Sequence, residues 1–342
     1  MRKFRLGKTG LMVSRVGIGG IPIQRPTVEE SKRVIWRALD LGINFIDTSI
    51  GYGDSELRIR EALKGRREGV IIATKGSWRS REQAENTING SLQRLGVDYI
   101  DLWQFHNVPT MEHYDNLIAD GGALEAAHEA LEAGKLRHLG ITSHNLDVAL
   151  KATTSDLFET IQFPFNFISD EAVKELIPLA SKHDVGFIGM KPFAGGNITD
   201  AGLAFRYLLQ FDSVLPDPGV EKVHEVEQIV SIVDDPKPLS ELDQMRISEI
   251  RAELGNRFCR QCLYCMPCPQ GVDIWMTMIT KKMHRLWPLE SFKEIMAEPI
   301  KSAGYCVECG ACEQKCPYGL RIREMLKENT LYYERILGEA GQ

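Results

Sequence analysis

Short apolar runs alternate with longer amphipathic stretches between residue 16 and about residue 234. The amphipathic stretches repeat apolar residues at three- and four-residue intervals, which is typical of helices packed on one face. The runs between them are nearly continuously apolar, which is typical of strands buried on both faces of a parallel sheet. We expect strands at 16–19, 43–47, 70–74, 99–105, 136–141, 160–163, 185–190 and 213–215, and helices that include 28–41, 81–95, 123–133, 170–182 and 222–233.

Eight strands that alternate with helices favour an α/β fold of the closed (β/α)8 TIM barrel type. The alternative is an open doubly wound sheet, which usually begins with a Gly-x-Gly-x-x-Gly turn after its first strand. Gly17, Gly19 and Gly20 have a different spacing, and no helix follows them directly. Segments 3–6 and 12–14 flank a glycine-containing loop and predict a β-hairpin at the lower end of the barrel.

The pattern changes after the last predicted barrel helix. The segment Asp234–Pro238 has the composition of a linker. Ser240 is then a candidate N-cap for a further helix, with Asp243 three residues later as a partial capping box. We therefore expect two domains, a barrel at 1–235 and a second domain at 236–342.

Composition excludes several classes of partner. The chain has 342 residues, 43% of them hydrophobic, and a net charge of −6. This charge gives no reason to expect binding to nucleic acid or to an anionic membrane. No apolar run approaches the roughly 20 residues that span a bilayer, and the N-terminus lacks the apolar stretch of a signal peptide. We expect a cytoplasmic protein.

Cysteine is confined to the end of the chain, where 8 residues form two groups. Each group ends in a cysteine followed by proline, and most gaps are two residues long. The second group matches the run C-x2-C-x2-C-x3-C-P of bacterial ferredoxins, and the first shortens its last gap by one residue. The groups are Cys259, Cys262, Cys265 and Cys268, and Cys306, Cys309, Cys312 and Cys316.

Paired C-x2-C motifs also suit tetrahedral zinc, so zinc is the alternative metal. Two groups of four with a proline after each fourth cysteine favour two [4Fe–4S] clusters. In two-cluster ferredoxins the fourth cysteine of a run ligates the other cluster. Crossed ligation predicts one cluster on Cys259, Cys262, Cys265 and Cys316, and the other on Cys306, Cys309, Cys312 and Cys268.

A polar set follows the second, third and fourth predicted strands, where catalytic residues of such barrels lie. It consists of Asp47, Tyr52, Lys75 and His106. Each residue alone has an ordinary structural explanation. Together they can protonate an oxygen, because an ammonium group lowers the pKa of a tyrosine, a carboxylate keeps that ammonium charged, and an imidazole orients a carbonyl group.

The segments around these residues resemble the aldo/keto reductase family. Asn44–Gly53, Ala73–Gly76 and Asp101–His106 are similar to the regions of its catalytic tetrad. Gly140–Asn145 and Gln162–Asn166 are similar to its contacts with the nicotinamide carboxamide. The resemblance implies that Tyr52 is the general acid/base, that Lys75 and Asp47 tune it, and that His106 positions the substrate. It also implies that Ser143, Asn145 and Gln162 hold the nicotinamide.

Two departures from the family pattern concern the nucleotide. Met190 stands where the family commonly has a tyrosine that stacks on the nicotinamide, so Met190 would pack on the ring. The segment around Gly219 and Lys222, expected to bind the adenosine phosphate, supplies one lysine beside Glu221. A 2′-phosphate requires cationic contacts, so NADP and NAD both stay open as the cofactor.

The whole chain resembles aldo/keto reductases that carry a C-terminal, α-helical, ferredoxin-like domain. We expect an oxidoreductase that interconverts a small-molecule carbonyl and an alcohol by hydride transfer with NADP or NAD. The two clusters would couple to this reaction or stabilise the fold. The alternative is an electron-transfer protein, in which the barrel binds nucleotide, flavin or a redox partner protein and the clusters relay single electrons.

Overall fold

A computed structural model describes residues 1–340 of the chain. It divides into two compact units, Met1–Gln244 and Met245–Gln342. The first unit contains all the predicted barrel strands, and the second contains all eight cysteines. The domain limits at 235 and 236 stay a prediction. Each unit is described by itself.

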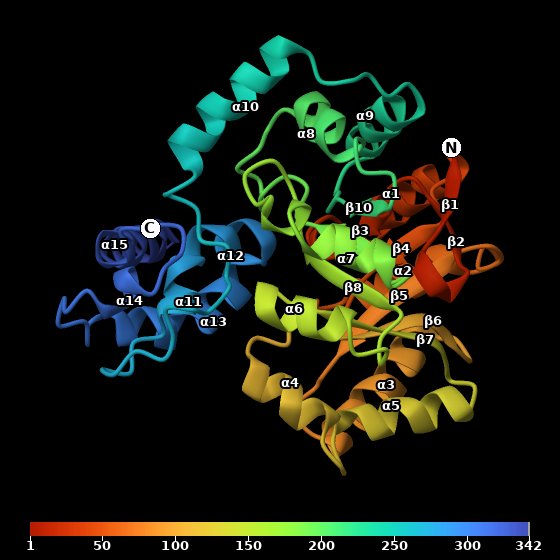
Figure 1. Cartoon of the computed structure of the whole chain (residues 1–342), viewed down its shortest axis with the longest axis horizontal. Helices are drawn as coiled ribbons and strands as arrows, with labels where there is room; N and C mark the ends of the chain where they lie inside the picture. Colours follow the sequence, from red (N-terminus) through yellow and green to blue (C-terminus); the bar gives the residue numbers. More distant parts are fainter. Residues whose placement is uncertain (341–342) are drawn as a thin grey trace. The chain divides into compact units, whose positions relative to one another are not determined.

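The first unit is built on a sheet of eight parallel strands, coloured from red to green in Figure 1. Neighbours in sequence are neighbours in the sheet, and a parallel bridge between Gly19 and Gly219 joins its two edges. The predicted TIM barrel is therefore confirmed. The strands are β3 (Ile18–Gly19), β4 (Phe45–Asp47), β5 (Ile71–Gly76), β6 (Ile100–Phe105), β7 (Leu136–Thr142), β8 (Thr160–Pro164), β9 (Gly186–Met190) and β10 (Val214–Asp217).

Helices surround these strands, as Figure 1 shows. The first begins at a capping box in which Thr27 and Glu30 bond reciprocally to each other's backbone amide groups. The predicted helix at 170–182 is interrupted, and forms the 3-10 turn η3 (Glu171–Val173) and α7. The helices are α1 (Val28–Asp40), α2 (Ser55–Leu63), α3 (Arg81–Leu95), α4 (Met111–Ile118), α5 (Ala123–Glu132), α6 (Leu146–Thr153), α7 (Leu176–Lys182), α8 (Ala201–Leu208) and α9 (Val223–Asp234).

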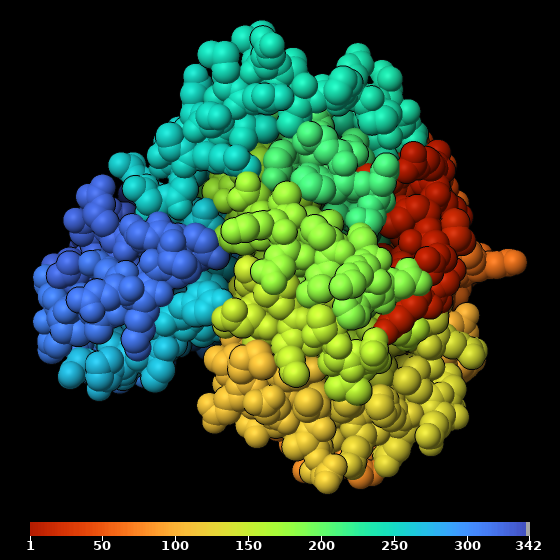
Figure 2. All heavy atoms as spheres, in the orientation of Figure 1, coloured from red at the N-terminus to blue at the C-terminus, as the bar shows by residue number. Residues whose placement is uncertain are grey.

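The predicted N-terminal hairpin is confirmed. Strands β1 (Lys3–Arg5) and β2 (Met12–Ser14) pair antiparallel. Leu6 and Val13 pack in one buried cluster with barrel residues such as Phe45, Ile71 and Leu102. The outer side of the hairpin, red in Figure 2, lies at the surface of the first unit. The hairpin thus closes the end of the barrel at which the strands begin.

Ser240 caps α10 (Glu241–Leu254), as predicted. The Asp243 backbone N–H donates to Ser240 Oγ at 3.1 Å, and the Ser240 N–H donates to Asp243 Oδ2 at 2.9 Å. This reciprocal pair satisfies two amide groups that the first turn of a helix leaves without partners.

The second unit is helical. It contains α11 (Ile274–Met278), α12 (Thr280–Leu286), α13 (Leu289–Ala303), α14 (Ala311–Gln314) and α15 (Ile322–Ala340). One of its buried clusters gathers Val272, Ile274, Leu320 and Ile322 against six of the cysteines. The other is centred on Phe292 and Met296. Within residues 1–340, no helix is long and apolar enough to cross a membrane.

Candidate active site and cysteine centre

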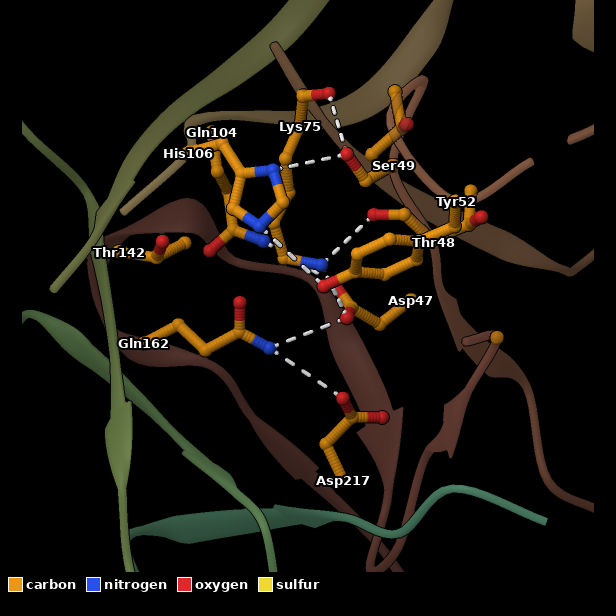
Figure 3. Close-up of polar contacts among 12 residues, drawn as sticks. Asp47, Thr48, Ser49, Tyr52, Lys75, Gln104, His106, Thr142, Gln162 and Asp217 are labelled. Carbon is orange, nitrogen blue, oxygen red and sulfur yellow. Dashed lines mark hydrogen bonds and ion pairs between the residues drawn. The ribbon is translucent and has the colours of Figure 1, made fainter. Parts of the chain in front are cut away.

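The barrel brings the four predicted catalytic residues together where its strands end (Figure 3). Asp47 ends β4, Lys75 lies next to the end of β5, and His106 directly follows β6. Tyr52 lies in the loop between β4 and α2. Parallel strands place all their carboxyl ends on one side of the barrel, so residues far apart in sequence meet there.

Lys75 is the buried cation of this site. Its Nζ donates to Asp47 Oδ2 at 2.5 Å and to the Thr48 carbonyl oxygen at 2.8 Å. The same ammonium group lies 5.0 Å from the centre of the Tyr52 ring. Lys75 is 2% exposed and Asp47 is 3% exposed, so water contributes little to the stability of either charge. Their ion pair replaces the lost hydration.

His106 links the tyrosine to the barrel wall. Its Nε2 lies 3.4 Å from the Tyr52 hydroxyl, and its Nδ1 lies 3.0 Å from Ser49 Oγ. The Tyr52 and His106 rings meet edge to face, with their centres 5.4 Å apart. A substrate oxygen that reaches Tyr52 is therefore within reach of the imidazole as well.

Burial and charge set the protonation of Tyr52 and Lys75. Burial raises the pKa of Tyr52, the charge of Lys75 opposes this, and the carboxyl groups of Asp47 and Asp217 add to the increase. Burial alone would lower the pKa of Lys75, but the charge of Asp47 and the nearby Tyr52 outweigh it and raise that pKa. Tyr52 is therefore a protonated phenol at neutral pH, and Lys75 is an ammonium group.

Asp217, Gln162 and Gln104 complete the network, and the sequence did not single out Asp217 or Gln104. The Gln162 amide nitrogen donates to Asp47 Oδ2 at 3.3 Å and to Asp217 Oδ2 at 3.4 Å. The Gln104 amide donates to Asp47 Oδ1 at 3.3 Å. A carboxylate within an otherwise apolar barrel strand was the available signal for Asp217.

The cysteines gather in two sets. Burial, and then the charges of nearby Cys259 and Cys316, raise the pKa of Cys262 to about 11. Burial and the thiols Cys259, Cys262 and Cys316 raise the pKa of Cys265 to about 12. Buried thiols that repel one another in their ionised form are a suitable donor set for a cationic iron centre.

The second set lines a small cavity beside the first. Five cysteines of the two motifs face it, namely Cys265, Cys268, Cys306, Cys309 and Cys312. Cysteines of both motifs therefore lie close together, which crossed ligation requires. Within residues 1–340, no group of three or more His, Cys, Asp or Glu side chains is arranged to hold a metal ion. The assignment of ligands stays a prediction.

Comparison with known proteins identifies the family. Residues 15–203 match the model of the aldo/keto reductase family, and residues 258–321 match the model of a 4Fe-4S dicluster domain. The chain belongs to the aldo/keto reductase family. This reductase is thus an oxidoreductase with a dicluster domain in its C-terminal region.

Relatives of this reductase include curated proteins and solved structures. It is 30% identical to the uncharacterized oxidoreductase YqkF of Bacillus subtilis, over 59% of this chain and 68% of the relative. It is 29% identical to L-galactose dehydrogenase of Arabidopsis thaliana, over 73% of this chain and 93% of the relative. The holo structure of aldo-keto reductase AKR11C1 from Bacillus halodurans superposes with a TM-score of 0.62 at 26% identity, over 73% of this chain and 96% of that structure.

The predicted nicotinamide contacts of the reductase lie just after β7, within β8 and at the end of β9. Ser143 Oγ donates to the Val108 carbonyl at 2.8 Å, and Asn145 Oδ1 accepts from the first turn of α6. Gln162 faces the barrel interior, as above, and Met190 is the half-buried last residue of β9. Ser143 and Asn145 therefore also have local structural roles, and their contact with a nucleotide stays a prediction.

Lys222, at the start of α9, lines a cavity of about 460 Å³. Arg25 and Arg33, from the segment that begins α1, line the same cavity, together with Glu30 and Glu221. The segment after β10 by itself supplies one cation to this cavity, Lys222. The closure of the barrel brings α1 beside α9 and adds two more cations, Arg25 and Arg33.

Proposed function

We propose that this reductase interconverts a small-molecule carbonyl and an alcohol with NADP(H), with Tyr52 as general acid/base. The observation that carries the proposal is the buried Asp47–Lys75 ion pair beneath Tyr52, with His106 at its hydroxyl group. In this combination Tyr52 is the acid, and the adjacent His106 orients the carbonyl oxygen that accepts its proton. One relative is named L-galactose dehydrogenase, an oxidoreductase of a sugar, which supports a reaction of the same class.

In the direction of reduction, Tyr52 donates its phenolic proton to the carbonyl oxygen. Lys75 stabilises the resulting phenolate, and Asp47 keeps Lys75 charged. His106 orients the carbonyl oxygen towards Tyr52. The nicotinamide, when bound, supplies the hydride to the carbonyl carbon. In the direction of oxidation the phenolate accepts the proton of the alcohol instead.

The barrel residues fit a nicotinamide carboxamide. Gln162 Oε1 and Gln104 Oε1 are buried and have no hydrogen-bond partner among the described residues. A buried acceptor without a partner costs about 1–3 kcal/mol, so a ligand that donates a hydrogen bond there is favoured. An amide N–H2 group meets this requirement, in agreement with the predicted role of Gln162.

The cavity at Lys222 supports NADP(H) over NAD(H). Three cationic side chains, Arg25, Arg33 and Lys222, surround a volume that suits a ligand group. Arginine and lysine form charge-assisted hydrogen bonds with phosphate. We propose that they hold the 2′-phosphate, with Gly219 allowing close approach of the backbone.

The test of the reaction is Tyr52→Phe. This change removes the proton donor and leaves the ring, so nucleotide binding should be retained while carbonyl reduction falls by about 10²–10⁴-fold. Nucleotide affinity is measured by fluorescence titration, and turnover by nicotinamide absorbance with a panel of aldehydes and ketones. Tyr99→Phe, just before β6 and remote from the site, is the matched control. Undiminished turnover in Tyr52→Phe would contradict the assignment.

For the C-terminal region we propose two [4Fe–4S] clusters with crossed ligands, in a domain at 236–342. Such clusters carry single electrons, whereas nicotinamide carries hydride. The match to a dicluster domain therefore favours a second candidate function, relay of single electrons to a redox partner protein. Anaerobic titration of Tyr52→Phe with NADPH separates the two. Bleaching of the cluster absorbance would favour electron relay, and unchanged clusters would favour a stabilising role.

A further inference from the structure

A second carboxyl group lies beside the catalytic ion pair. Asp217 ends β10 and is 5% exposed. One amide nitrogen, Gln162 Nε2, lies 3.3 Å from Asp47 Oδ2 and 3.4 Å from Asp217 Oδ2, as Figure 3 shows. The two carboxyl groups therefore share a neighbour within a buried space.

The surroundings of Asp217 contain too little positive charge for two carboxylates. Asp47 from β4 and Lys75 from β5 are the charged groups that act on it, and Tyr52 is the nearby phenol. From β8 it meets the neutral Gln162, and Gly17 and Gly19, before and within β3, lie close to its oxygens. Lys75 already forms a 2.5 Å ion pair with Asp47. Two carboxylates that share one ammonium group in a buried site do not both ionise at neutral pH.

We propose that Asp217 carries a proton at neutral pH, donates it to Asp47, and is thereby a positioning residue for the Lys75–Tyr52 pair. The proposal deepens the proposed function and rests on it for the catalytic consequence. Geometry supports it, since Asp217 Oδ1 has no hydrogen-bond partner among the described residues and Oδ2 accepts one long hydrogen bond of 3.4 Å from Gln162, which is less than a buried carboxylate requires. Burial, and then the charge of Asp47, raise the pKa of Asp217 well above its usual range.

The proton on Asp217 determines the charge beneath Tyr52. With it, the Asp47, Asp217 and Lys75 side chains sum to zero. Without it they sum to −1, and the negative charge on Asp217 raises the pKa of Tyr52 further. A protonated Asp217 therefore keeps Lys75 effective in stabilising the Tyr52 phenolate.

Infrared difference spectroscopy of wild type against Asp217→Asn tests the proton directly. The expected wild-type spectrum at pH 7 contains a carbonyl band of a protonated carboxylic acid that shifts in D2O and is absent from Asp217→Asn. Asp101→Asn is the matched control. Asp101 is also buried but pairs with Arg67 at 2.6 Å, so this change should remove only carboxylate bands. Loss of carboxylate bands alone in Asp217→Asn would overturn the proposal.

The pH profile of alcohol oxidation tests the positioning role. In wild type we expect Asp217 to ionise before Tyr52 as pH rises, and its charge then raises the pKa of Tyr52. Asp217→Asn stays neutral, so the alkaline limb assigned to the phenolate should move to lower pH by about one unit. A merely structural role would change stability without moving this limb, and superimposable profiles would overturn the positioning role. If wild type shows no carbonyl or alcohol turnover, the proposed function fails, whereas the infrared result still decides whether Asp217 is protonated.

Discussion

Burial affects the charges of two residues in this site, Lys75 and Asp217, in different ways. Lys75 and Asp217 are both buried, yet Lys75 keeps its charge and Asp217 does not. Burial opposes the charged form of each group. Lys75 faces two carboxyl groups and a phenol, and their combined effect on its pKa outweighs that of burial. Asp217 faces a carboxylate that already engages the shared ammonium group, so the neutral form is favoured.

The raised pKa of Asp217 predicts a pH dependence of stability. Between the ordinary pKa of a carboxyl group and the raised pKa of Asp217, the folded chain keeps a proton that the unfolded chain has released. The free energy of unfolding should therefore decrease as pH rises through this interval, by at most about 1.4 kcal/mol per pH unit. Asp217→Asn should lose this contribution, seen as a flatter dependence of the thermal midpoint on pH under anaerobic conditions.

The control for this effect is Asp101→Asn, because Asp101 is buried but paired with Arg67. Its thermal midpoint should decrease at neutral pH while the slope assigned to Asp217 stays that of the wild type. Parallel curves for wild type and Asp217→Asn would show that Asp217 releases its proton in the folded chain as readily as in the unfolded chain.

At the scale of elements, the closure between β3 and β10 organises the nucleotide end of the barrel. The backbone N–H groups of Gly17 and Gly19 donate to the carbonyl oxygens of Pro216 and Pro218 at 2.9 and 2.8 Å. These contacts fix the loop after β10 beside the segment that leads into α1. Three cations from the two segments then share one cavity.

Removal of the α1 cations should change the choice of nucleotide. Arg25→Gln with Arg33→Gln is expected to raise the Kd for NADPH by roughly 100-fold or more, because each of the two lost charge-assisted hydrogen bonds contributes about 1.5–3 kcal/mol. The Kd for NADH, which lacks the 2′-phosphate, should not change. Lys32→Gln is the matched control, since Lys32 lies over the Trp36 ring and does not line the cavity. Equal loss of affinity for both nucleotides would place the phosphate elsewhere.

At the scale of the whole chain, each proposed cluster takes its ligands from two motifs that are about 40 residues apart. Helices α11, α12 and α13 lie between the motifs in sequence, and the buried cluster around Val272 and Ile322 packs against cysteines of both. The fold of this unit and the binding of its clusters should therefore be coupled.

Pairs of cysteine substitutions test the crossed assignment. Anaerobically purified wild type is expected to contain about eight iron atoms per chain, and a chain that loses one cluster about four. Cys259→Ser combined with Cys316→Ser affects one predicted cluster and should retain about four iron atoms, whereas Cys306→Ser combined with Cys316→Ser should lose both clusters. The opposite result would indicate uncrossed ligands, and zinc in place of iron would exclude the clusters.

Features that depend on local order could be predicted from the sequence. The alternation of apolar runs and amphipathic stretches predicted all eight barrel strands, and the cap at Ser240 follows from the residues beside it. Asp47, Lys75 and His106 were found as polar residues at the ends of predicted strands, which any closed parallel barrel brings to one rim. The cysteine motifs were readable because their spacing is short and regular.

Features that depend on contacts between distant segments could be seen only in the folded chain. Asp217 keeps its proton because it lies close to Asp47, a residue 170 positions earlier in the chain. No pattern in the strand of Asp217 indicates this neighbour. Arg25 and Arg33 join Lys222 only because the barrel closes and places its first helix beside its last. Sequence patterns report which groups a segment can bury or expose. The charge that a buried group keeps depends on every side chain that the fold packs around it.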